Sequence, residues 1–106
     1  MDPVQEQLDA YNARDVDRFL ACYAPDVVME DGEGRVQSRG VDEARPRYAA
    51  LFARNPDLRC ELMSRIRVGR FVVDEERVTG AGPEPIHAVA IYRVEGDRIA
   101  HVRFLR

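Results

Sequence analysis

The sequence predicts an α+β fold in which helices near the start of the chain pack on one face of a curved antiparallel sheet. Helical patterns end before residue 56, whereas long segments that alternate apolar and polar residues follow it. The later segments are separated by short turns, which favours hairpin connections between neighbouring strands. A chain of 106 residues is long enough for one core, so residues 1–106 are expected to form a single domain.

Two short helices are expected first. Asp2 can accept hydrogen bonds from a first turn and Pro3 suits the first helical position, so one helix should run to about Ala13. Asp15 can cap a second helix, which Pro25 should stop. Both show apolar residues at helical spacing. These residues are Val4, Leu8 and Tyr11 in the first helix and Val16, Phe19, Leu20 and Tyr23 in the second.

Val27–Met29 favours a strand that ends in Glu30 and Asp31. The glycines at 32 and 34 should then turn the chain into a short strand over 35–39. Asp42 can cap a third helix, irregular at its start because of Pro46, that carries Tyr48, Leu51 and Phe52 and ends at Asn55–Pro56.

Alternation dominates the second half of the chain. From Leu58 to Val68 a half-buried strand is expected. Its buried face would carry Leu58, Cys60, Leu62, Ile66 and Val68, and its exposed face Arg59, Glu61, Arg65 and Arg67. Further strands are expected up to Thr79, over 86–94 and over 98–105. In the last two strands, one parity is small and aromatic and should face the helices. It comprises Ala88, Ala90, Tyr92, Ala100, Val102 and Phe104.

The amino-acid composition limits which reactive side chains, and therefore which classes of reaction, are available. All 16 basic side chains are arginine, and without lysine a Schiff-base enzyme, a pyridoxal-phosphate enzyme and a P-loop ATPase are excluded. Serine, threonine and histidine are scarce, so carboxylates and tyrosines remain as acid/base groups. A net charge of −3 argues against a nucleic-acid partner. We expect Cys22 and Cys60 to be buried thiols, and their spacing with the histidines predicts no metal site and no metal cofactor.

The acidic run Asp74, Glu75 and Glu76 has two interpretations. In the simpler one, which we favour, the run lies on a solvated sheet edge. Alternatively, because side chains alternate along a strand, at least one carboxylate faces inward, and it then needs an arginine partner such as Arg65 or Arg67. No apolar segment is long enough to cross a bilayer, and residues 1–4 lack the basic residues typical of a signal peptide. We therefore expect a cytoplasmic protein without membrane contact.

Three segments in order carry a family resemblance. They are residues 7–15 (QLDAYNARD), 22–31 (CYAPDVVMED) and 92–99 (YRVEGDRI). Their order and spacing resemble the nuclear transport factor two-like superfamily, and more narrowly its SnoaL-like and ketosteroid isomerase-like branch. The resemblance implies a cone-shaped fold, with three N-terminal helices packed on a strongly curved mixed or antiparallel sheet. Members of this superfamily include isomerases, cyclases, hydratases and binding modules, so the fold alone does not choose a function.

The resemblance also implies site residues. Asp31 matches the general base of the ketosteroid isomerases, and Tyr48 matches a tyrosine of their active-site network. Gln7 and Ala90 occupy the positions of the two acidic oxyanion donors. Because losing even one such donor commonly costs about 2.7–4 kcal/mol of transition-state stabilisation, efficient steroid isomerisation is not expected.

The resulting hypothesis is an apolar pocket with Asp31 at its polar end. A small, mostly hydrophobic molecule would bind there and undergo cofactor-free acid/base chemistry, with Asp31 as base and with Tyr48 and Gln7 as hydrogen-bond donors. The alternative is a ligand-binding or dimerisation module without catalysis. A homodimer is expected through the outer face of the sheet, which is half apolar and carries His87 and His101. The expected pocket lining is Tyr11, Phe19, Tyr48, Phe52, Ala90, Tyr92 and Val102.

Overall fold

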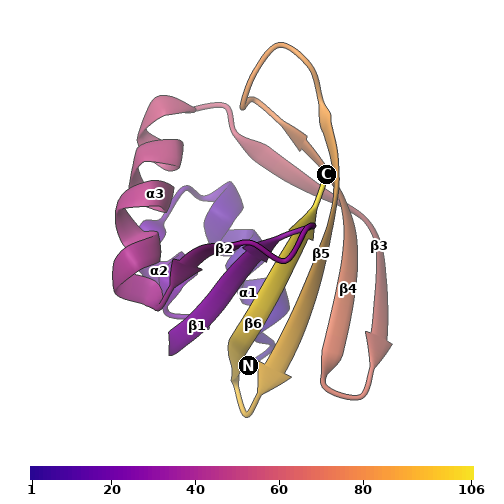
Figure 1. The fold of residues 1–106 in the computed structure, drawn as a ribbon. Helices are drawn as coiled ribbons and strands as arrows, with labels where there is room; N and C mark the ends of the chain where they lie inside the picture. Colours follow the sequence, from indigo (N-terminus) through magenta and orange to yellow (C-terminus); the bar gives the residue numbers. More distant parts are fainter.

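The computed structural model describes residues 1–106 and places three helices against one six-stranded sheet (Figure 1). The predicted α+β class, with three helices packed on a curved mixed sheet, is confirmed. The helices are α1 (Pro3–Asn12), α2 (Val16–Leu20) and α3 (Val41–Arg54). The strands are β1 (Tyr23–Asp31), β2 (Val36–Arg39), β3 (Arg59–Val68), β4 (Phe71–Thr79), β5 (Ile86–Glu95) and β6 (Arg98–Leu105).

The strand order is β2-β1-β6-β5-β4-β3. All neighbouring strands are antiparallel except β1 and β6, which run parallel. After β2 the chain crosses the helical side of the sheet as α3 and enters the opposite edge at β3, as Figure 1 shows. Three hairpin connections then lead from β3 through β4 and β5 to β6, which lies beside β1. The helices and the inner face of the sheet therefore enclose the core, and β1 and β6 join the early and late parts of the chain.

The first helical cap is confirmed and the second helix is shorter than predicted. Asp2 Oδ1 accepts hydrogen bonds from the first-turn amides of Val4 and Gln5. Asp15 caps α2, but α2 ends at Leu20 and the chain is already extended at Tyr23. Pairing with β6 explains this, because Tyr23 lies opposite Ile99, whose amide donates to the carbonyl of Cys22. A tertiary contact overrides the local helical pattern.

The start of α3 differs from the prediction. The helix begins at Val41 and its cap is Gly40, not Asp42. Gly40 has φ +81°, and a Cβ there would lie 3.0 Å from the carbonyl oxygen of Pro25, so glycine suits this junction. Pro46 lies within the helix, where its missing N–H cannot bond the carbonyl of Asp42. The predicted end at Asn55 is confirmed.

The expected alternation along β3 holds only in its first half. A β-bulge between Leu62 and Ser64 inserts one residue and reverses the parity of the strand. Beyond the bulge Ile66 and Val68 are therefore 59% and 65% exposed, and Arg65 turns to the helical side instead. The prediction that Ile66 and Val68 share the buried face with Cys60 is wrong for this reason.

The buried core lies between the helices and the inner face of β5 and β6, as the small-and-aromatic parity predicts for Ala90, Tyr92 and Val102. The parity fails at Ala100, where the register shifts and Ile99 is buried instead. Ala90, Tyr92 and Val102 are almost completely inaccessible to solvent. Cys22 and Cys60 are both buried and free, in agreement with the prediction. None of the three helices combines the length and apolar character that crossing a bilayer would require.

Candidate active site

A cavity of about 300 Å³ opens between the helices and the inner face of the sheet. Most of its walls are apolar, but a few polar and charged side chains also reach it. Its lining includes five of the residues predicted for the pocket: Gln7, Tyr11, Phe19, Tyr48 and Tyr92. The other lining residues are Leu8, Tyr23, Gln37, Arg47, Ala50, Leu51, Arg54, Asn55, Cys60, Glu76, Val78, Ala81, Ile86, Ala88, Phe104 and Arg106.

Three residues expected in the lining belong to the core behind it. Phe52 packs edge-on against Tyr11 and Phe19, with ring centroids 5.3 and 5.7 Å apart, so these two rings screen it from the cavity. Ala90 and Val102 are fully buried. Both lie in the central strands, and the larger side chains paired with them, Phe104 and Tyr92, form the cavity wall instead.

Asp31 is not among the residues that line the cavity. It ends β1 beside Phe104, which does line it, but its Oδ1 atom accepts hydrogen bonds from the amides of Glu33 and Arg35, each at 2.9 Å. These bonds fix the turn between β1 and β2. In this structure the carboxylate of Asp31 therefore serves as an acceptor for the turn.

Glu76 is the carboxyl group that faces the cavity. It lies on the inner side of β4 and is only 7% exposed. Burial raises its pKa to about 7, and the nearby charge of Asp74 adds to this, while the Cys60 thiol and the Arg65 charge act in the opposite direction. A carboxyl group that titrates near neutral pH can both accept and donate a proton there.

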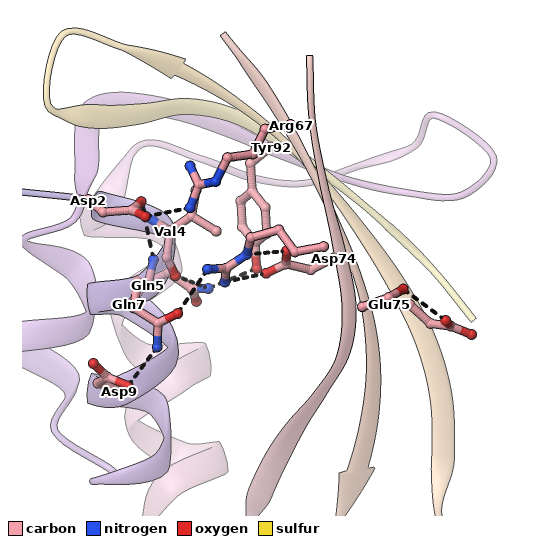
Figure 2. A network of polar contacts seen from close by, with 11 residues as sticks. Asp2, Val4, Gln5, Gln7, Asp9, Arg67, Asp74, Glu75 and Tyr92 are labelled. Carbon is pink, nitrogen blue, oxygen red and sulfur yellow. Dashed lines mark hydrogen bonds and ion pairs between the residues drawn. The ribbon is translucent and has the colours of Figure 1, made fainter. Parts of the chain in front are cut away.

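Asp74 lies one pleat away on the same face of β4 and is completely buried. Arg65 holds it with two hydrogen bonds, from Nε to Oδ1 (2.7 Å) and from Nη2 to Oδ2 (2.9 Å). Arg65 also donates to Gln5 of α1 at 2.8 Å. Figure 2 shows this network between α1 and the sheet, with Glu75 on the opposite side of β4. The ion pair therefore supplies the partner that a buried carboxylate requires.

The favoured interpretation of the acidic run, a solvated sheet edge, is thus wrong for two of its three members. Asp74 and Glu76 face inward, and Arg65 is the partner that the alternative anticipated. Only Glu75 faces outward, where it bonds Ser64 and His87. A signal for this was present, because Val72 and Val78 flank the two acids at the same parity and are typical of an inner face.

Gln7 joins two buried tyrosines. Its Nε2 atom donates to the Tyr92 hydroxyl and to the carbonyl of Val4, both at 3.0 Å, and its Oε1 atom accepts from the Tyr23 hydroxyl at 3.3 Å. The amide is therefore used within the protein, and neither donor hydrogen remains for a ligand.

The hydroxyls of Tyr11 and Tyr48 have no protein partner. Both side chains line the cavity, and burial raises the pKa of Tyr48 to about 12 and that of Tyr11 further still. Both hydroxyls therefore remain protonated at neutral pH and can donate hydrogen bonds to a ligand. Elsewhere, no group of three histidine, cysteine or acidic side chains has an arrangement that could hold a metal ion.

Comparison with known proteins gives the family. The SnoaL-like domain matches residues 4–102. A cystatin-fold protein from Novosphingobium aromaticivorans is 33% identical, with 100% of this chain and 99% of that chain covered and a TM-score of 0.89. No curated protein matches significantly.

More distant structures share the fold alone. A SnoaL-like protein of unknown function from Burkholderia thailandensis is 20% identical, with 94% and 87% of the two chains covered and a TM-score of 0.81. A protein with a ketosteroid isomerase-like fold from Catenulispora acidiphila, solved in complex with trimethylamine, is 17% identical over 96% and 82%, with a TM-score of 0.77. The match over nearly all of its length shows that the chain belongs to the SnoaL-like domain family.

Proposed function

We propose that the chain binds a small, mostly hydrophobic molecule in the cavity and acts on it by acid/base catalysis without a cofactor, with Glu76 as the group that transfers the proton. The observation that carries this proposal is a buried carboxyl group, facing an open apolar cavity, whose pKa is raised to about 7. Such a group is matched to proton transfer near neutral pH.

The chemistry that fits best is removal of a proton from carbon next to a carbonyl group. The Glu76 carboxylate takes the proton, the electron pair of the broken C–H bond moves into an enolate, and the enolate oxygen accepts hydrogen bonds. Tyr11 and Tyr48 are the available donors, since the amide of Gln7 is already engaged. Returning the proton at another atom would complete an isomerisation.

Proton exchange tests this proposal without knowledge of the natural substrate. Apolar ketones such as 2-tetralone and 4-phenyl-2-butanone would be incubated with the protein in D₂O, and loss of the α-proton signal would be followed by NMR. The exchange rate should rise with pH through about 7, because the ionised Glu76 is the base. Glu76→Gln should abolish the catalysed exchange.

Asp31→Asn is the matched control, because it neutralises the carboxylate that the family resemblance favours. It should keep the exchange, since Asp31 binds turn amides outside the cavity lining. If Asp31→Asn abolished exchange and Glu76→Gln left it intact, the base would be Asp31 and our assignment would be wrong.

A non-catalytic binding module is the second candidate function. The observation in its favour is the absence of a strong oxyanion donor at two positions, because Ala90 has no polar group and Gln7 bonds Tyr23, Tyr92 and Val4. A ligand that binds in the cavity, combined with exchange at the rate of protein-free buffer for every ketone tested, would favour this candidate.

We also propose that two copies associate through the outer face of the sheet. Val68 and Phe71 form a cross-strand pair there and are exposed, together with Ile66. The same face carries both signs of charge, with Glu75 beside His87, so a two-fold copy can match apolar and charged parts. Sedimentation should give a dimer at micromolar concentration and a monomer for Ile66→Glu. A wild-type monomer would refute this assembly.

A further inference from the structure

Three arginines line the cavity without an acidic partner. They are Arg47 and Arg54 of α3 and Arg106, which follows β6. None of the three forms an ion pair or a side-chain hydrogen bond within the chain. Other arginines are engaged, for example Arg18 with Glu6 and Arg45 with Asp17.

The three arginines form an exposed part of the cavity wall. Each is exposed, whereas Glu76 is buried among the inner residues. Figure 1 shows that the end of α3, the loop that joins β4 to β5 and the C-terminus lie toward the same end of the molecule, and all three segments contribute lining residues. The cavity therefore has cations at its mouth and an acid inside.

We propose that the ligand is an amphiphilic small acid, with an apolar body inside the cavity and a carboxylate, or a group of similar charge, held at the mouth by Arg47 and Arg54. This inference rests on the proposed function, because it names the class of substrate for the same site. Guanidinium groups are the side chains best suited to bind a carboxylate, through paired N–H donors.

Arg47 and Arg54 present their side chains on the same side of α3 as part of the apolar wall. Arg47 and Arg54 are seven residues apart, so they lie on one side of α3 and about 10 Å apart along its axis. Tyr48 and Leu51 lie between them and also line the cavity. An acid at this mouth would thus place its apolar part directly against an apolar wall.

Electrostatics support the same orientation. The charges of Arg47 and Arg106 reach the Tyr48 hydroxyl, where they lower its pKa against the larger effect of burial. The inner part of the cavity offers no free cation, since Arg65 is paired with Asp74, and its one carboxyl group is Glu76. Since the whole chain carries a net charge of −3, attraction of an anion depends on the local mouth arginines and not on the global field.

The test compares acids with their own neutral amides. The probes are 4-phenylbutyrate, 2-naphthylacetate and octanoate, each paired with its primary amide, and dissociation constants would be measured by calorimetry. We expect at least one acid to bind about tenfold more tightly than its amide, with an advantage that shrinks as salt is added.

Single substitutions test which arginines bind the carboxylate. Arg47→Gln and Arg54→Gln should each weaken acid binding by about three- to tenfold and leave amide binding unchanged. Arg39→Gln is the matched control, because Arg39 is exposed, makes no ion pair and does not line the cavity. It should leave the affinity for the acid as in the wild type. All three side chains are exposed, so thermal unfolding should confirm that the variants fold.

The outcomes separate this inference from the proposed function. If no acid binds more tightly than its amide, or if Arg39→Gln weakens binding as much as Arg47→Gln and Arg54→Gln, the inference is overturned. Glu76→Gln should retain acid binding while losing ketone exchange. Acid binding together with normal exchange in Glu76→Gln would support the ligand class and refute the base.

Discussion

Neutralising Glu76 should make the protein more stable at alkaline pH. Glu76 is 7% exposed, and its pKa is raised from 4.5 to about 7, first by burial and then by the charge of Asp74. The unfolded chain lacks this environment, so its carboxyl group ionises at lower pH than that of the folded protein. Glu76→Gln keeps the shape of the protonated side chain and removes the ionisation.

The size and sign of this change in unfolding free energy follow from the linkage between proton binding and folding. A carboxyl group whose pKa is raised in the folded state stabilises the fold fully below the unfolded pKa, and this contribution is lost as pH rises to the folded pKa. At about 1.4 kcal/mol per pH unit, the interval from 4.5 to about 7 corresponds to roughly 3 kcal/mol of unfolding free energy. Glu76→Gln should therefore gain about this much relative to the wild type between pH 4.5 and pH 7.5, after which the difference is constant.

Urea unfolding followed by circular dichroism at a series of pH values measures this difference. Glu75→Gln, one residue away on the outer face of β4, is the control with the opposite sign. Hydrogen bonds from His87 and Ser64 lower the pKa of Glu75, so its contribution is present above the unfolded pKa and lost as pH falls. Glu75→Gln should accordingly lose stability relative to the wild type as pH rises.

The pH dependence of the difference in unfolding free energy between Glu76→Gln and the wild type tests whether burial raises the pKa of Glu76. A constant offset between Glu76→Gln and the wild type from pH 4.5 to 7.5 would refute the burial argument. In that case Glu76 would ionise alike in the folded and unfolded chains, and the case for it as a neutral-pH base would fail too.

Two further predictions concern the polar groups around the cavity. Arg65→Met should destabilise the fold by about 3–5 kcal/mol in urea unfolding at pH 7, because it leaves the buried carboxylate of Asp74 uncompensated; a loss below about 1 kcal/mol would show that the pair is dispensable. Gln7→Leu should cost about 1–3 kcal/mol by the same measurement, since it removes the partner shared by the Tyr23 and Tyr92 hydroxyls. Unchanged stability would mean that these hydroxyls find other partners.

Local signals predicted most of the fold. Aspartate caps at residues 2 and 15 marked two helix starts, Asn55 marked a helix end, and alternation placed Ala90, Tyr92 and Val102 inside. The errors have non-local causes. Tyr23 fits a helical pattern, but it pairs with a strand that lies far along the chain. Local periodicity contains no information about such a partner.

The candidate site was harder to predict for the same reason. Asp31 stood out because it ends a strand in a recognisable pattern, yet its carboxylate is used by the adjacent turn. Glu76 was part of an acidic run, and the direction of its side chain depends on the register of β4 with both neighbours. Whether a carboxylate is buried depends on how the whole sheet packs. In the sequence, only Val72 and Val78, which share the parity of Glu76, indicated that this side chain faces inward.

The bulge in β3 determines both which side chains of this strand face the helices and which face the solvent. One inserted residue near Met63 turns Arg65 toward Asp74 on the helical side and leaves Ile66 and Val68 facing the solvent. Deleting that residue would exchange the two sets of side chains, exposing the cation and burying the aliphatic groups in its place. The charge compensation of Asp74 beside the cavity and the apolar area exposed on the opposite face of the sheet therefore depend on the same residue. A single insertion or deletion in this strand would change both.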